Sequence, residues 1–308
     1  MAAAIDLAAP EITGLLARCH YPPSGTPVVC AVSGGADSLA LLVLARAAGC
    51  PTLAVHVDHG LRPGSAGEAD VVATAAAAVG AHFRAERVDV AAGPNLEARA
   101  RAARYAVLPD GAMTGHTADD RAETVLLNLL RGSAAAGLAG IRRTPRRPLL
   151  DLRRADTAGL CAALGLPTVD DPSNRDPAFR RNRVRHELLP LLADVGDRDP
   201  VPVLVRQADL FAELDDLVTA QAATIDATST AALVAAPPAV ARAAVRSWLV
   251  AAGVGDGYPV DAAAVDRVLG LARHDAVATE VAGGWRVQRS GGRLAVVAPT
   301  PCKDARHG

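Results

Sequence analysis

Six consecutive residues, Ser33-Gly34-Gly35-Ala36-Asp37-Ser38, constrain the fold of this chain more than any other stretch. They stand between an apolar run at 28–32 and a run with helical periodicity at 39–45. This pattern predicts a strand, a tight turn and a helix. The two glycines can adopt positive φ, which lets the backbone approach a ligand closely. Serine hydroxyls and the free N–H groups of the helix N-terminus favour an anion, so the turn is predicted to bind phosphate.

The other residues of the turn restrict the kind of phosphate site. Asp37 would repel a phosphate unless a divalent cation such as Mg²⁺ lay between them. A Walker loop requires a lysine before its Ser or Thr, whereas the only lysine of this chain is Lys303. The dinucleotide-binding motif requires a third glycine where this chain has Ser38. A plain strand-to-helix turn without a ligand stays open as an alternative.

Composition limits the class of protein only coarsely. The 308 residues are half hydrophobic and carry 32 basic and 33 acidic side chains, so bulk charge indicates no nucleic-acid partner. The five cysteines form no C-x-x-C pair, which argues against a disulfide framework and against a zinc or iron–sulfur site. The sequence shows no basic signal-peptide start and no membrane-length apolar run. We expect a cytoplasmic protein without membrane contact.

The chain up to residue 198 alternates between predicted strands and helices. This alternation predicts an α/β fold with a parallel sheet and helices on both faces. Ligands of such sheets bind at the carboxyl ends of the strands, where the glycine turn, His56 and Gly115 are expected. Residues 199–308 are predicted to form a smaller helical domain that ends in a β-meander. The predicted strands are 28–32, 52–57, 82–88, 111–115, 277–282, 285–288 and 294–297, and the predicted helices are 39–45, 66–80, 96–107, 118–131, 156–164, 203–224, 238–252 and 261–273.

A second informative stretch runs from Gly115 to Thr124. On a helix that starts near Ala118, Asp120 and Glu123 are three residues apart and share a face. Two carboxylates that converge on a pocket suit an ammonium group or Mg²⁺, but a solvated acidic first turn would have the same sequence. His116 is equally compatible with a ligand site and with a hydrophobic core.

Seven blocks of the chain together resemble the tRNA(Ile)-lysidine synthetases, a family of N-type ATP pyrophosphatases with a PP-loop. The first block is the glycine turn, which resembles the pyrophosphate loop of these enzymes. The blocks occur in the family's order and span about residues 28–192. They are SGGADS at 33–38, HVDHGLR at 56–62, EARARAARY at 97–105, HTADDRAET at 116–124, LRGS at 130–133, RPLL at 147–150, and DPSN at 171–174 with RNRVR at 181–185.

The resemblance implies an ATP-dependent ligase that joins lysine to the wobble cytidine of the CAU-anticodon tRNA(Ile). In that family the cytosine O2 attacks the α-phosphate of ATP, and the lysine amine then displaces AMP from C2. The reading of the codon changes from AUG to AUA. The resemblance therefore implies ATP, Mg²⁺, lysine and tRNA(Ile) as ligands, and the sequence leaves a homodimer open.

The resemblance also implies a role for individual residues. Catalysis is assigned to Asp37, Asp120, Glu123 and His116, and metal binding to Asp37. The nucleotide is assigned to Ser33, Gly34, Gly35, Ala36, Asp37, Ser38, His56 and Gly115. Contact with tRNA is assigned to Arg131, Arg181, Arg183 and Arg185, although these arginines could instead form a solvated face, and to the domain at 199–308.

Two other functions remain as alternatives. One is a tRNA thiolase on the same fold, although thiolases that resemble two-thiocytidine enzymes carry C-x-x-C pairs that this chain lacks. The other is a non-catalytic module that binds ATP or tRNA. Three carboxylates near a polyphosphate, at Asp37, Asp120 and Glu123, argue against pure binding.

Overall fold

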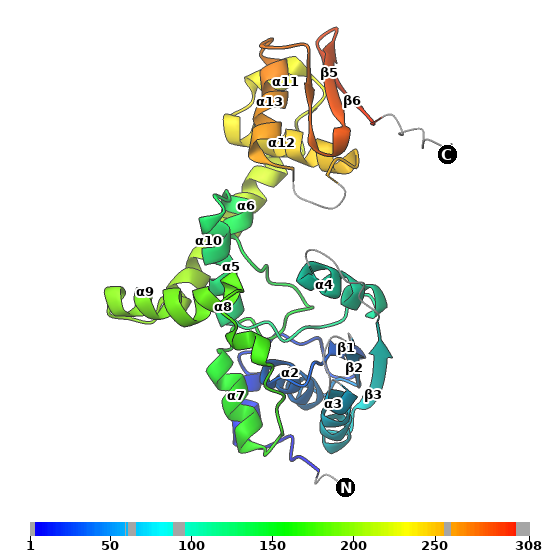
Figure 1. Cartoon of the computed structure of the whole chain (residues 1–308), viewed down its shortest axis with the longest axis vertical. Helices are drawn as coiled ribbons and strands as arrows, with labels where there is room; N and C mark the ends of the chain where they lie inside the picture. Colours follow the sequence, from blue (N-terminus) through cyan, green and yellow to red (C-terminus); the bar gives the residue numbers. More distant parts are fainter. Residues whose placement is uncertain (1–3, 59, 61–65, 89–95, 256–259, 300–308) are drawn as a thin grey trace, which may run out of the picture. The chain divides into compact units, whose positions relative to one another are not determined.

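The computed structural model describes residues 4–58, 60, 66–88, 96–255 and 260–299. The chain divides into two compact units, Met1–Phe211 and Ala212–Gly308 (Figure 1). The division falls inside helix α10 (Pro200–Ala222), whereas the sequence places it after Arg198. The helical structure is interrupted just before α10, because Asp197 ends the preceding helix in a left-handed conformation with φ 47°.

A three-stranded parallel sheet organises the first unit. Its strands are β1 (Val28–Ala31), β2 (Thr52–Asp58) and β3 (His82–Arg87), in the spatial order β1-β2-β3. The expected parallel α/β fold is thereby confirmed. Because parallel strands end at the same edge, the segments that follow β1 and β2 meet at one place.

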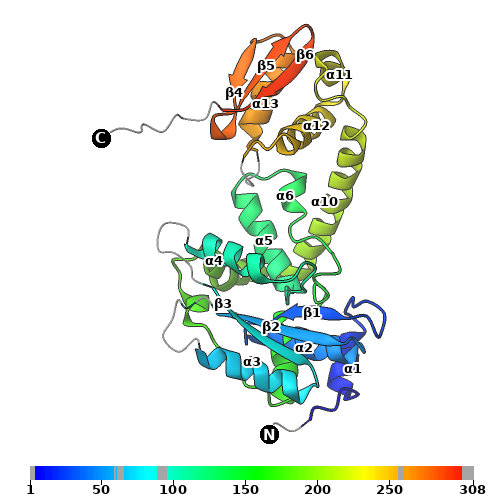
Figure 2. The same ribbon diagram turned by 90° about the vertical axis from the view of Figure 1, so that its right-hand side faces the viewer.

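Helices cover both faces of this sheet, as Figure 2 shows. On one face, Cys30 and Ala54 pack with α2 (Ala36–Ala47) and α3 (Ala66–Ala78) in the main core of the unit. On the other face, Val55 packs with Leu108 and Tyr105 at the end of α4 (Leu96–Val107). Because successive side chains of a strand point to opposite faces of the sheet, both faces of β2 are buried.

The segment 111–115, expected as a strand, forms only a single bridge. Met113 pairs in parallel with Cys30 beside β1. Gly111 precedes the bridge with φ 82°, and after the bridge the N–H of Thr114 donates to the carbonyl of Arg146 at 2.8 Å. The backbone leaves the sheet at both ends of the bridge, so the strand prediction for 111–115 is wrong.

The remaining helices of the first unit include a one-turn π-helix, η2 (Val184–Leu188), between α8 and α9. The N–H of Leu189 donates to the carbonyl of Val184, five residues back, which is the hydrogen bond of a π-helix. The next residue, Pro190, has no N–H to donate to the carbonyl of His186. The set comprises α1 (Pro10–Leu16), α5 (Ala118–Leu130), α6 (Ala135–Leu138), α7 (Arg154–Ala163), η1 (Pro172–Arg175), α8 (Arg180–Arg183) and α9 (Leu189–Gly196).

The second unit contains helices and an antiparallel meander around its own core, which includes Val245, Val265 and Val287. The meander and two of its helices are as predicted, whereas the short helix α11 is an addition that Ser229 caps by accepting from Ala232 N–H. No helix among the described residues is long and apolar enough to span a membrane. The elements are α11 (Thr230–Ala235), α12 (Pro238–Ala251), α13 (Ala262–Ala272), β4 (Ala278–Glu280), η3 (Ala282–Gly284), β5 (Arg286–Ser290) and β6 (Arg293–Val297).

Candidate active site

A cavity of about 780 Å³ lies where β1 and β2 end. The glycine turn and the start of α2 form one part of its lining, and the segment 114–116 with Asp120 forms another. Arg154 and Arg185 also line it, although both are distant from the turn in sequence. The cavity is where parallel α/β sheets bind their ligands.

The glycine turn uses its two glycines differently. Gly34 has φ 85°, and a Cβ placed on it would lie 2.8 Å from the Cγ2 of Val169. Gly35 has φ −71° and precedes α2 as its N-cap, so only Gly34 requires the left-handed region. The hydroxyl of Ser38 accepts from the N–H of Ser33 at 3.1 Å and donates to the carbonyl of Gly35 at 2.8 Å. These bonds hold the turn in a fixed shape at the N-terminus of α2.

Gly115 allows two backbones to approach each other closely. A Cβ on Gly115 would lie 2.6 Å from the carbonyl oxygen of Asp37 and 3.1 Å from the amide nitrogen of Ser38. No side chain fits at such distances, so glycine is required here although its φ is ordinary. Gly115 thus sets the position of Asp37 besides lining the cavity.

Asp37 is a partly buried carboxylate that lines the cavity. Burial raises the pKa of Asp37 to about 6, against the lowering effect of the hydrogen bond from the hydroxyl of Thr157. Arg154 Nε lies 3.6 Å from Oδ2 of Asp37. A carboxylate whose charge is disfavoured by burial gains from a cation, so Asp37 suits a metal ion that also contacts phosphate.

Asp120 has both carboxylate oxygens occupied by hydrogen-bond donors. Its Oδ2 accepts from the backbone N–H of Thr117 at 2.8 Å, at the start of α5. Its Oδ1 accepts from Arg154 at 3.1 Å and from Arg181 at 2.9 Å. Burial alone would raise the pKa of Asp120, but the two guanidinium groups outweigh it and hold that pKa below its ordinary value.

Glu123 lies one turn further along α5 and has no solvent exposure. Three arginines surround it: Arg154 at 3.1 Å, Arg181 at 2.7 Å and Arg185 at 2.7 Å. Asp120 and Glu123 do share a helical face, but this face is covered by guanidinium groups. An ammonium group could reach Glu123 only by displacing an arginine.

The site therefore contains an ionic cluster of three carboxylates and three guanidinium groups. Arg181 and Arg185 were expected from the sequence to contact tRNA, and Arg154 and Thr157 were not expected at the site. The sequence indicates Arg154 only through its place in a segment rich in arginine, three residues before Thr157. The cluster consists of Asp37, Asp120, Glu123, Arg154, Arg181 and Arg185.

The two histidines assigned from the sequence lie in different places. His116 lines the cavity, and its Nδ1 is 2.7 Å from the hydroxyl of Thr114. His56 is buried, does not line the cavity, and has its Nδ1 2.9 Å from the carbonyl oxygen of Val32. The geometry gives His56 the role of supporting the strand before the glycine turn.

Arg131 and Arg183, the other arginines assigned to tRNA, lie outside this cavity. Both line a second cavity beside the end of α5. Arg183 is paired with Glu187 at 2.9 Å. Contact of these four assigned arginines with tRNA stays a prediction.

Comparison with family models decides the class of this site. Residues 11–192 match the model of the PP-loop domain, which includes the glycine turn, the cavity and the ionic cluster. Residues 229–295 match the model of the TilS substrate binding domain, within the second unit. The chain belongs to the tRNA(Ile)-lysidine synthase family. The resemblance of the seven sequence blocks is thereby confirmed.

Similarity to individual members of the family extends over most of the chain. A tRNA(Ile)-lysidine synthase of Nocardia farcinica is 44% identical, with 79% of this chain and 81% of the relative covered. One from Rhodococcus jostii is 42% identical over 93% of this chain and 87% of the relative. Among solved structures, a U34-tRNA thiolase from Methanococcus maripaludis with its [4Fe-4S] cluster has a TM-score of 0.51, with 66% and 77% of the two chains covered. Its 18% identity shows a shared fold alone.

Proposed function

We propose that this chain joins lysine to C2 of the wobble cytidine of the CAU-anticodon tRNA(Ile), with ATP converted to AMP and pyrophosphate. The observation that carries the proposal is the convergence of the glycine turn, Asp37, His116 and Asp120 on one cavity. In an adenylation reaction the site must hold the triphosphate so that the base attacks the α-phosphate and pyrophosphate departs. The turn at the start of α2 supplies anion-binding N–H groups for the departing pyrophosphate.

The residues also fit a Mg²⁺ ion that accompanies ATP. No group of three or more metal-ligating side chains occurs among the described residues, but Mg²⁺ beside a nucleotide needs only one or two carboxylates besides phosphate oxygens. Asp37 has the buried position that would gain from such an ion. Mg²⁺ would neutralise the developing charge on the phosphates.

Lysine would bind at the cavity side of the ionic cluster. Asp120 lines the cavity, whereas Glu123 is enclosed by arginines. We therefore place the ammonium group near Asp120 and give Glu123 the task of orienting Arg154, Arg181 and Arg185. A lysine amine that attacks C2 must be neutral. Because the pKa of Asp120 is held below its ordinary value, we give Asp120 the task of positioning the ammonium group rather than of accepting its proton.

We further propose that residues 199–308 recognise tRNA, which the match of 229–295 to a substrate-binding domain supports. An enzyme that acts on tRNA with ATP and lysine would work in the cytoplasm.

The products of ATP test the proposed reaction. The protein is incubated with ATP, Mg²⁺, lysine and a transcript of the CAU-anticodon tRNA(Ile), and nucleotides are separated by chromatography. We expect AMP and pyrophosphate in equal amounts, dependent on the tRNA. Formation of ADP and phosphate would contradict the proposal, and sulfur transfer to the tRNA would favour a thiolase.

A further inference from the structure

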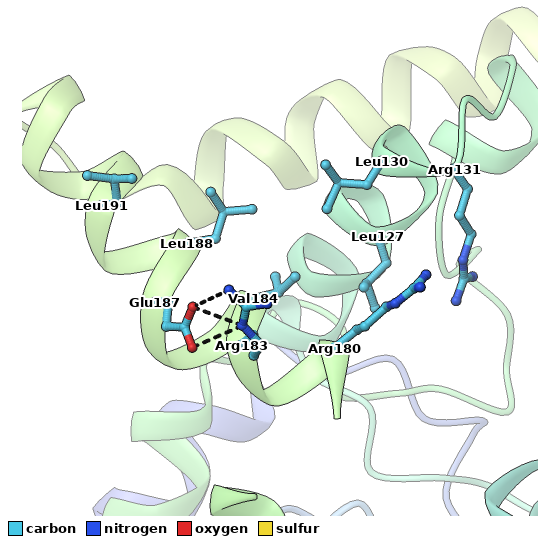
Figure 3. Close-up of a pocket in the computed structure, with 9 residues that line it drawn as sticks. All are labelled: Leu127, Leu130, Arg131, Arg180, Arg183, Val184, Glu187, Leu188 and Leu191. Atoms are coloured by element: carbon cyan, nitrogen blue, oxygen red, sulfur yellow. Dashed lines mark hydrogen bonds and ion pairs between the residues drawn. The ribbon is translucent and has the colours of Figure 1, made fainter. Parts of the chain in front are cut away.

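A second cavity, of about 460 Å³, lies beside the C-terminal end of α5 within the first unit. We call it the leucine groove (Figure 3). Leucines of α5 face leucines of η2 and α9 across it, and arginines stand at its edge. Its size lies in the range of small-ligand sites. It is lined by Leu127, Leu130, Arg131, Arg180, Arg183, Val184, Glu187, Leu188 and Leu191.

The leucine groove continues the face of α5 that carries the carboxylates of the active site. Asp120, Glu123, Leu127 and Leu130 follow one another at spacings of three and four residues, so they form one stripe along the helix. Leu130 lies seven residues beyond Glu123, which corresponds to about 10 Å along the helix axis. The groove and the active site therefore lie along the same helix.

The apolar lining of the groove is costly for a surface that stays in water. Leu130 is 71% exposed and Leu191 is 56% exposed, although Val184 below them is buried. Exposed leucines that gather around a cavity mark an interaction site rather than a core. The groove therefore favours a ligand with an apolar face.

The edge of the groove favours a negatively charged ligand. Glu187 is the one acidic residue in the lining, and Arg183 pairs with both of its oxygens, at 3.1 Å to Oε1 and 2.9 Å to Oε2. For Arg180 no ion pair is found among the described residues, and Arg131 makes only a 3.5 Å contact with Asn128 there. Two guanidinium groups without a carboxylate partner can each bind a phosphate.

We propose that the leucine groove binds an unstacked nucleoside of the tRNA, near the nucleotide that enters the active site. The base would pack against Leu130 and Leu191, and the flanking phosphates would contact Arg131 and Arg180. Bases of single-stranded loops can be splayed out and held between apolar side chains. The inference rests on the proposed function, since it takes tRNA as the substrate. A second copy of this chain would have to bring acidic residues to both arginines.

A pair of neighbouring leucines gives a matched test. Leu130→Asp places a negative charge in the groove, whereas Leu129→Asp places it on the same turn of α5 at a residue that is 57% exposed and outside the lining. We expect Leu130→Asp to weaken binding of the CAU-anticodon tRNA(Ile) by at least roughly tenfold, because the new carboxylate would lie against the base and repel the flanking phosphates. Leu129→Asp should stay within about twofold of wild type. Thermal melting and the Kd for ATP show that both variants are folded.

Salt dependence separates the apolar contact from the phosphate contact. For Leu130→Ala we expect weaker tRNA binding with an unchanged slope of log Kd against log salt. For Arg131→Ala we expect the magnitude of the slope to fall by about one, because one phosphate contact is lost. Equal slopes for wild type and Arg131→Ala would overturn the assignment of a phosphate to this arginine.

The remaining outcomes are distinguishable. Equal tRNA affinity of Leu130→Asp and Leu129→Asp would overturn the inference and leave the proposed function intact. If Leu130→Asp instead changed the sedimentation coefficient and not the tRNA affinity, the groove would be an interface between two copies and the inference would be wrong. If the wild-type protein bound no tRNA, the proposed function would fail, and the inference with it.

Discussion

The Nε atom of Arg185 lies 2.7 Å from Oε1 of Glu123, a carboxylate without solvent exposure. Arg185 belongs to the π-helix η2 and Glu123 to α5, so this ion pair holds η2 against α5. With Arg154 and Arg181 on the same carboxylate, Glu123 holds three segments of the chain together.

Glu123→Gln is therefore expected to destabilise the first unit. The variant keeps part of the hydrogen bonding but removes the one negative charge that, among the described residues, pairs with all three arginines. Loss of one partner in a buried ionic group typically costs about 3 to 5 kcal/mol, and the retained amide oxygen should reduce this cost to about 2 to 3 kcal/mol. Urea unfolding followed by circular dichroism measures it. Glu187→Gln, at an exposed pair with Arg183, is the control and should change the free energy of unfolding far less, because water screens an exposed ion pair. Equal effects of the two substitutions would contradict the role of Glu123.

Asp37→Asn is expected to abolish ATP consumption and yet to stabilise the protein above pH 6. Burial raises the pKa of Asp37 to about 6, so the folded state holds this proton more tightly than the unfolded state. Folding therefore becomes less favourable as pH rises from about 4 to 6, where the buried group must lose its proton. The neutral amide avoids this cost.

The difference in unfolding free energy between Asp37→Asn and wild type measures that cost. In EDTA this difference should be small at pH 4, grow to about 3 kcal/mol by pH 7 and stay constant above. A difference that is independent of pH would show that the Asp37 carboxyl titrates normally. Pyrophosphate release at the wild-type rate would contradict its role in catalysis.

Gly115→Ala is expected to displace the start of α2. A Cβ there would lie 2.6 Å from the carbonyl oxygen of Asp37, and backbone cannot yield as a flexible side chain can. We expect a loss of at least roughly 1 kcal/mol of stability and a larger KM for ATP. The matched control is Gly159→Ala in α7, where a Cβ has open space. That control should be neutral or stabilising by up to about 1 kcal/mol. An unchanged KM in Gly115→Ala would show that the contact is not needed to shape the site.

The sequence predicted the parts of the site that depend on local pattern. The glycine turn, the start of α5 at Ala118 and the shared face of Asp120 and Glu123 follow from residue order and helical periodicity. The covering of this face by arginines did not follow. Arg154 reaches Glu123 across 31 residues of sequence, and Arg185 across 62.

Long-range contacts of this kind depend on the path of the intervening chain. The path includes the π turn before Pro190, which the periodicity of the sequence does not predict. Residues 111–115 do not form a strand for a similar reason, because the N–H of Thr114 donates to the carbonyl of Arg146, which is distant in the sequence. His59 and residues 61–62 of the HVDHGLR block lie outside the described residues, as do the side chains of Glu97, Arg101 and Arg104.

Lysine transfer to a single cytidine can be measured directly. Radiolabelled lysine, ATP and the protein are incubated with transcripts of tRNA(Ile) and of tRNA(Met), both with the CAU anticodon, and label in tRNA is counted, with Asp37→Asn as the inactive control. We expect stable incorporation into tRNA(Ile) that stops when the wobble cytidine is replaced by uridine, and far less into tRNA(Met). Absence of lysine from tRNA(Ile), or equal label after the cytidine is replaced, would contradict the proposed function.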